Sequence, residues 1–177
     1  MAQVNVEAIC NQALDVIGYK RHIGSVWDGT PAARVALDLY SETRDEVLVL
    51  RPWPFAVGRY TITPTTDGPA PDYPWLYKYI RPISPLKILD VYPGGMDYAA
   101  IMKVEPVRWL ERFDLALRAR VIWTEFTAAR AVVIESVDEP EVFSPEFIAT
   151  LVQALAEKFQ RALVGAPQRQ QSGEGKE

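Results

Sequence analysis

The stretch from residue 30 to residue 55 constrains the fold most, because it has a defined start and a defined end. Thr30 can cap a helix with its hydroxyl, and Pro31 suits the first helical turn, where N–H groups have no intrahelical partner. The run RPWPF at 51–55 ends the helix, since each proline removes a donor and disfavours helical geometry in the residue before it. A helix over 31–50 is therefore predicted.

Apolar residues recur inside this helix at three- and four-residue spacing, and they make a stripe wider than a narrow seam. The helix over 31–50 is therefore expected to bury two flanks. The prolines at its end fix the direction of the chain that follows. Trp53 and Phe55 are therefore expected to pack against the protein rather than to bind a ligand.

Two further helices are predicted from caps and periodicity. Asn5 can cap a helix near 5–18. Ser144, followed by a proline and a glutamate, begins a third helix near 145–164. The expected core anchors of the chain are Trp53, Phe55, Leu155 and Phe159.

The middle of the chain consists of short alternating or β-branched segments separated by turns rich in proline and glycine. Residues 108–117 fit either a strand or another element. A mainly antiparallel sheet of about five or six strands is expected. The predicted strands cover 56–63, 75–81, 86–92, 98–104, 120–126 and 131–137.

These elements predict an α+β fold: a three-helix antiparallel bundle with an inserted, mainly antiparallel β domain. The bundle is expected to comprise residues 1–55 and 144–165, and the β domain residues 56–143. The segment 166–177 contains no large apolar residue, so it cannot offset the entropy of ordering and is expected to be disordered.

Composition limits the class of protein. The 177 residues carry a formal net charge of −4, which argues against a surface that grips phosphate backbones by net charge. No apolar run approaches the roughly 20 residues of a membrane span, and the N-terminus lacks a secretory pattern, so no membrane partner is expected. Cys10 is the only cysteine and fits an apolar helix pattern, as in a protein of a reducing cytoplasm.

The residue types needed for common catalytic sites are scarce. One histidine and one cysteine cannot build a histidine-rich zinc site, and a triad would have to use His22, which lies in a predicted loop. The acidic residues of 138–141 precede a helix and are interpreted as a solvated turn. No catalytic, cofactor-binding or metal-ligating residue is predicted, and the chain is not expected to be an enzyme.

The segment 73–81 is rich in aromatic residues and leaves an alternative open. Tyr73, Trp75, Tyr77 and Tyr79 could form a stacking platform for single-stranded nucleic acid or a sugar. Packing in a core is favoured, because only Lys78 and Arg81 lie nearby to contact phosphates. A nucleic-acid or carbohydrate-binding module using 73–81 is thus the alternative function, and a carboxylate hydrolase the third.

Three blocks of the chain resemble a known family. They are IGSVWDGTPAARVALDLYSETRDEVLVLRPWPFA, DYPWLYKYIRPISPLKILDVY and EPEVFSPEFIATLVQALAEKFQRALVG. In this order they are similar to the head-to-tail adaptors of tailed bacteriophages, of the tail tubular or gatekeeper type. The resemblance covers most of the chain but rests on structural motifs, so it carries over no catalytic residue.

The resemblance implies a structural protein of the virion neck or tail, assembled in the cytoplasm of the bacterial host. Copies, about twelve of them, would form a closed ring that needs two different complementary patches on each subunit. The implied partners are the portal protein above and a tail nozzle or tail tube component below. DNA would pass through the channel without specific binding, and no cofactor is implied.

Assembly contacts are expected in irregular segments, because long loops on a sheet are usually functional. The loop 64–74 and the turn 93–97 would meet neighbouring subunits or the next tail component, and the tail 166–177 would meet the portal. The expected interface residues are Asp67, Asp72, Tyr73, Asp97, Arg169 and Lys176.

Overall fold

The computed structural model describes residues 4–67, 70–82, 85–95 and 108–165. The chain divides into two compact units. Residues 1–50 and 138–177 form the first, called here the helical unit, and residues 51–137 form the second, called here the β unit. The expected disordered tail, 166–177, lies outside the described residues.

The helical unit contains α1 (Val6–Val16), α2 (Pro31–Leu50) and α4 (Pro145–Phe159), which continues into the π-helical turn η3 (Gln160–Val164). A short 3₁₀ turn, η2 (Pro140–Val142), precedes α4. The predicted caps are confirmed: the side chains of Asn5, Thr30 and Ser144 accept hydrogen bonds from backbone N–H groups three residues later, at 2.8, 3.2 and 3.3 Å.

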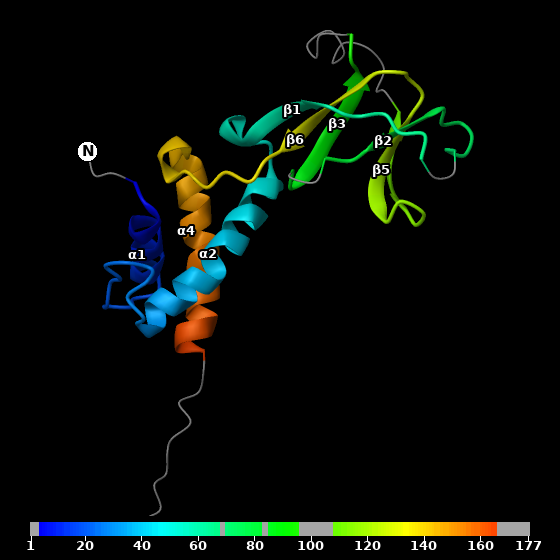
Figure 1. Cartoon of the computed structure of the whole chain (residues 1–177). Helices are drawn as coiled ribbons and strands as arrows, with labels where there is room; N and C mark the ends of the chain where they lie inside the picture. Colours follow the sequence, from blue (N-terminus) through cyan, green and yellow to red (C-terminus); the bar gives the residue numbers. More distant parts are fainter. Residues whose placement is uncertain (1–3, 68–69, 83–84, 96–107, 166–177) are drawn as a thin grey trace, which may run out of the picture. The chain divides into compact units, whose positions relative to one another are not determined.

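The predicted antiparallel three-helix bundle is wrong. α4 packs against both α1 and α2, and it is the helix that lies between the other two, as Figure 1 shows. This position follows from the width of its apolar surface, because a helix that buries side chains on two flanks can contact two neighbours. The buried residues of α4 are Phe147, Leu151, Val152, Leu155, Ala156 and Phe159.

The β unit contains two separate three-stranded antiparallel sheets. The first has the order β1 (Val57–Thr61), β6 (Ala129–Ile134), β3 (Lys87–Pro93), and the second β2 (Tyr77–Ile80), β5 (Ala119–Thr124), β4 (Trp109–Asp114). The 3₁₀ turn η1 (Pro54–Ala56) leads into β1.

The expectation of one inserted sheet of five or six strands is therefore also wrong. The ambiguous segment 108–117 contains β4, which pairs with β5 across a tight turn. The predicted strand 98–104 lies outside the described residues. Alternation along a strand gives its faces but not the sheet to which it belongs, so the split into two sheets could not be read from the pattern.

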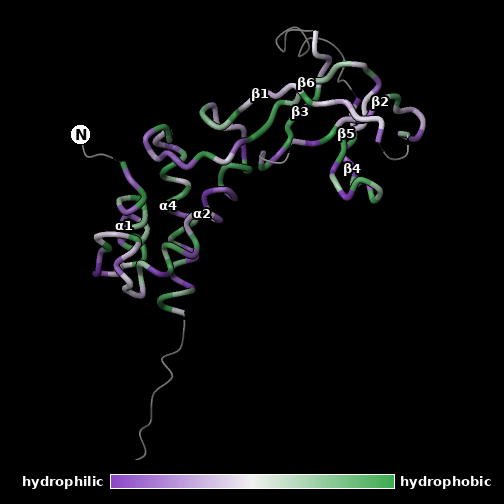
Figure 2. The backbone as a smooth tube through the Cα atoms, in the orientation of Figure 1, coloured by the Kyte–Doolittle hydropathy of each residue, from purple (hydrophilic) through white to green (hydrophobic). Residues whose placement is uncertain are grey.

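Both sheets contribute to one hydrophobic core. Alternate residues of β6 point into this core, and β3, which also lines it, is coloured hydrophobic along much of its length in Figure 2. Tyr79 of β2 is fully buried, and its hydroxyl donates a hydrogen bond to the Phe126 carbonyl at 2.9 Å. The buried core residues are Ile62, Tyr79, Ile88, Val91, Ile122, Ala129, Ala131 and Val133.

Three of the four expected core anchors are buried. Trp53, Leu155 and Phe159 are at most 2% exposed. Phe55 is only partly buried, and its ring centroid lies 6.3 Å from that of Trp53. None of the described helices combines the length and the apolar character needed to cross a membrane.

Candidate assembly surface

The turn that joins β4 to β5 is fixed by its own aspartate. Asp114 closes β4, and its Oδ1 accepts hydrogen bonds from the N–H groups of Ala116 at 2.9 Å and Leu117 at 3.1 Å. An aspartate that bonds the backbone two and three residues ahead favours a tight turn over a longer loop. The turn ends at Arg118, whose φ of 49° is left-handed, and β5 begins at the next residue.

A buried lysine connects this turn to the loop that precedes β2. Lys78 Nζ lies 3.2 Å from Asp114 Oδ2, and the two side chains are almost completely buried. The same ammonium group donates a hydrogen bond to the backbone carbonyl of Asp67. A buried ion pair is tolerated only when further hydrogen bonds satisfy its remaining donors and acceptors, and here backbone groups supply them. Lys78 thereby fixes two irregular segments relative to each other.

The carboxyl group of Asp114 gives this turn a predictable pH dependence. Hydrogen bonding from the Leu117 N–H, helped by Lys78 and Ala116, lowers the pKa of Asp114 below its ordinary value of 3.8. A carboxyl group whose pKa is lower in the folded state stabilises the fold above the ordinary pKa, and this stabilisation is lost as pH falls through the folded-state pKa. We therefore expect the stability contributed by Asp114 to be unchanged between about pH 5 and 8 and to be lost in acid.

Denaturant unfolding of wild type and Asp114→Asn from pH 7 to pH 2 would measure this contribution. The stability difference between them should be constant above about pH 5 and shrink below the ordinary pKa, because only the wild type loses a charged Asp114 there. Asp67→Asn is the matched control, since the structure uses the backbone carbonyl of Asp67. A difference that stays constant down to pH 2 would contradict the role of Asp114.

A second contact, on the surface, joins the same two segments. Arg112 of β4 forms an ion pair with Asp72 of the loop at 3.1 Å, and its guanidinium group lies 4.9 Å from the ring centroid of Trp123. These residues line a depression of about 360 Å³ together with Phe113, Leu115 and their neighbours. The Trp123 indole N–H is buried and has no hydrogen-bond partner among the described residues.

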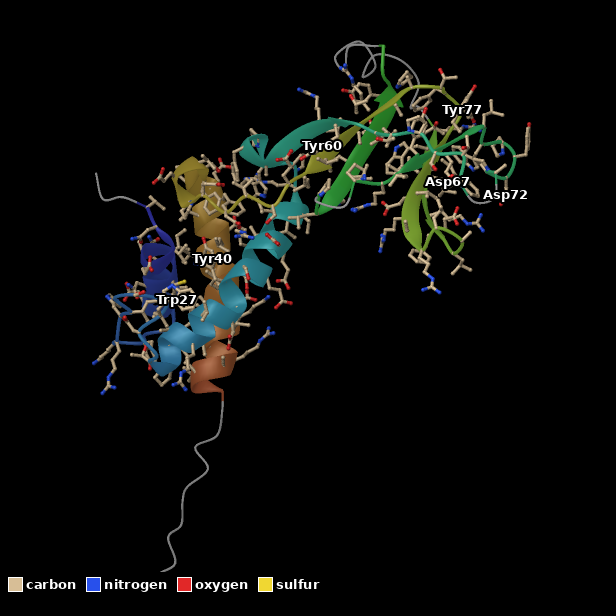
Figure 3. All side chains as sticks on the ribbon, in the orientation of Figure 1. Trp27, Tyr40, Tyr60, Asp67, Asp72 and Tyr77 are labelled. Atoms are coloured by element: carbon tan, nitrogen blue, oxygen red, sulfur yellow. The ribbon has the colours of Figure 1, made fainter. Side chains whose placement is uncertain are left out.

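Large apolar side chains are exposed around this depression. Leu115, which is 83% exposed, and Phe113, which is more than half exposed, line it, and Tyr73, next to Asp72, is 96% exposed. Figure 3 labels Asp67 and Asp72 on the loop and Tyr77 on β2. Single exposed apolar residues are ordinary, but several around one depression are typical of a protein interaction surface. We call Asp72, Tyr73, Arg112, Phe113 and Leu115 the candidate assembly surface.

Two of the predicted interface residues, Asp72 and Tyr73, lie in the candidate assembly surface. The structure brings Asp72 into contact with the hairpin, and Tyr73 is the next residue of the loop. The side chain of Asp67 is exposed while its carbonyl binds Lys78. Asp97, Arg169 and Lys176 lie outside the described residues.

Sequence reasoning missed the hairpin half of this surface. Phe113 and Leu115 flank Asp114 in a segment, 108–117, whose pattern fits more than one element. The available signal was Asp114 itself, because an aspartate inside a strand-like run can end the strand in a tight turn. The apolar residues beside such a turn have little opportunity to enter a core.

The aromatic segment 73–81 does not form a continuous platform. Tyr79 is fully buried in the core, and Tyr77 packs against the same core. Trp75 is partly buried, which leaves Tyr73 as the fully exposed aromatic residue of the four. A stacking platform needs several exposed faces in a row, so the geometry does not favour the nucleic-acid or carbohydrate alternative.

Two other potentially reactive side chains, Cys10 and His22, belong to the helical unit. Burial raises the pKa of the Cys10 thiol to about 12, so this thiol is protonated at neutral pH. His22 Nε2 lies 2.6 Å from Asp15 Oδ1 on an exposed part of the helical unit. Within the part of the chain that the structure describes, no group of three or more His, Cys, Asp or Glu residues could hold a metal ion.

In comparisons with known proteins, no family model and no curated protein sequence matches the chain.

Proposed function

We propose that this chain is the subunit of a head-to-tail adaptor ring in a tailed bacteriophage. The observation that carries the proposal is the candidate assembly surface, where a loop and a hairpin are held together by Lys78 and Arg112 while large apolar side chains remain exposed. A rigid support under exposed aromatic and aliphatic groups is typical of a protein–protein interface. This surface favours assembly over catalysis.

The kind of assembly, an adaptor ring, is proposed from the three sequence blocks that resemble adaptor proteins. Under this proposal the ring, of about twelve copies, binds the portal protein on one side and a tail nozzle or tail tube component on the other. The protein would belong to the neck of the virion and be assembled in the bacterial cytoplasm. DNA would move through the ring without specific binding, which agrees with the net charge of −4.

Light scattering after size-exclusion chromatography tests the proposal directly. The purified chain is mixed with the portal protein of the same phage, and we expect co-elution with several copies bound to each portal ring. Tyr73→Asp combined with Leu115→Asp should reduce the copies bound, because it places charges in an interface core. Trp27→Asp is the matched control, since Trp27 is also largely exposed but belongs to the helical unit.

Two results would contradict the proposal. One is a chain that neither associates with itself nor binds the portal. The other is undiminished portal binding by the variant that combines Tyr73→Asp with Leu115→Asp. That result would show that the candidate assembly surface lies outside the interface.

A further inference from the structure

Charge is distributed unequally between the two units. The sequence of the helical unit contains 8 basic and 14 acidic residues, a net charge of −6, whereas that of the β unit contains 11 basic and 9 acidic residues, a net charge of +2. A chain with this division presents complementary charges to other copies of itself. Local surfaces on each unit show where the complementarity is concentrated.

On the β unit, basic side chains gather at the tip of the β4–β5 hairpin. Arg112, Arg118 and Arg120 are exposed there, next to the exposed side chains of Phe113 and Leu115. Arginine and aromatic residues are types enriched in protein interfaces. We call these five residues the hairpin tip.

On the helical unit, α2 presents an acidic face. Asp38 and Glu42 are exposed and lie one helical turn apart, beside Leu37, which is 42% exposed. Like charges at this spacing repel each other, so a cation from outside would stabilise the helix. Neither carboxylate has an ion-pair partner among the described residues. We call Leu37, Asp38 and Glu42 the α2 acidic face.

We propose that the hairpin tip of one copy binds the α2 acidic face of the next copy. This inference rests on the proposed ring and names the two patches that such a ring requires. Arg118, which has no ion-pair partner among the described residues, would pair with Asp38 and Glu42, while Phe113 and Leu115 would pack against Leu37. Because the two patches differ, the contact is heterologous, and its repetition closes a ring when the rotation allows.

The hairpin tip suits a protein partner better than nucleic acid. Two of its three arginines already have carboxylate partners, Arg112 with Asp72 and Arg120 with Glu111 at 2.9 Å. A surface that binds duplex DNA relies on cations free to replace counterions at phosphates. Leu115, the more exposed of the two apolar side chains of the tip, has no role at a phosphate but fits an apolar contact.

Charge reversal tests the pairing with two variants. The first, Arg118→Glu with Arg120→Glu, reverses the hairpin tip. Its effect on the fold should be small, because the pair between Arg120 and Glu111 is at the surface and Glu111 keeps Arg81 at 3.1 Å. The second, Asp38→Lys with Glu42→Lys, reverses the α2 acidic face. The control, Lys20→Glu with Arg21→Glu, changes the net charge as much as the first at exposed positions of another loop.

Mass photometry, with and without the portal, counts the copies in each assembly, and circular dichroism confirms that each variant is folded. Each reversed variant alone should associate at least about tenfold more weakly than wild type, because like charges then face each other. An equimolar mixture of the two should recover wild-type association, since each variant offers the charge that the other now needs. The control should behave as wild type.

Other outcomes separate the inference from the proposed function. If wild type assembles and either reversed variant assembles equally well alone, the proposed contact is overturned while the ring stands. If the equimolar mixture fails to recover wild-type association, the proposed contact is likewise overturned while the ring stands. If reversal of the hairpin tip spares assembly but abolishes salt-sensitive binding to duplex DNA, the tip is a DNA surface and the contact is again overturned. A wild-type chain that is monomeric even with the portal would overturn the proposed function itself.

Discussion

Replacing Leu155 by alanine should lower the free energy of unfolding of the helical unit by about 2–5 kcal/mol. Leu155 lies in α4, is fully buried, and belongs to the helix that packs against both α1 and α2. The truncation removes apolar contacts and leaves a cavity that the surrounding helices can close only in part. Denaturant unfolding followed by circular dichroism at the helix band measures the change.

Leu50→Ala is the matched control for this experiment. It makes the same chemical change in the same unit, but Leu50 is 70% exposed, so a loss of no more than about 0.5 kcal/mol is expected. A similar small loss for Leu155→Ala would show that α4 does not organise the helical unit.

The second large effect is expected in the β unit. Tyr79→Ala should destabilise it by about 3–5 kcal/mol, the range seen for buried aromatic residues, because Tyr79 is fully buried in the core that both sheets line. Tyr79→Phe keeps the ring and removes only the hydrogen bond to the Phe126 carbonyl, so it should cost about 0.5–1.5 kcal/mol.

Unfolding monitored by amide hydrogen exchange can assign each loss to its unit, because peptides of the β unit and the helical unit are read separately. Equal effects of the alanine and phenylalanine substitutions would contradict the core position of the ring. Loss of protection only in the helical unit would contradict the assignment of Tyr79 to a core shared by the two sheets.

The helix starts could be predicted because capping is local. Asn5, Thr30 and Ser144 each act on a backbone group three residues away, so their effect is visible in a short stretch of sequence. The end of α2 at Leu50 could be predicted for the same reason, since the prolines that follow act on their immediate neighbours.

The arrangement of these elements was not predictable in the same way. Helical periodicity gives each helix an apolar face, but it does not say which helices cover that face, and the expected bundle was wrong for this reason. The candidate assembly surface depends on contacts between residues far apart in sequence: Lys78 with Asp114, and Arg112 with Asp72. Only Asp72 and its neighbour Tyr73 were expected from loop composition.

Cryo-electron microscopy of the chain bound to its portal tests the proposed function most directly. The account predicts a closed ring of this chain coaxial with the portal, with the β4–β5 hairpin at a subunit boundary. Portal particles that carry no such ring under conditions where the chain is folded would contradict the adaptor assignment.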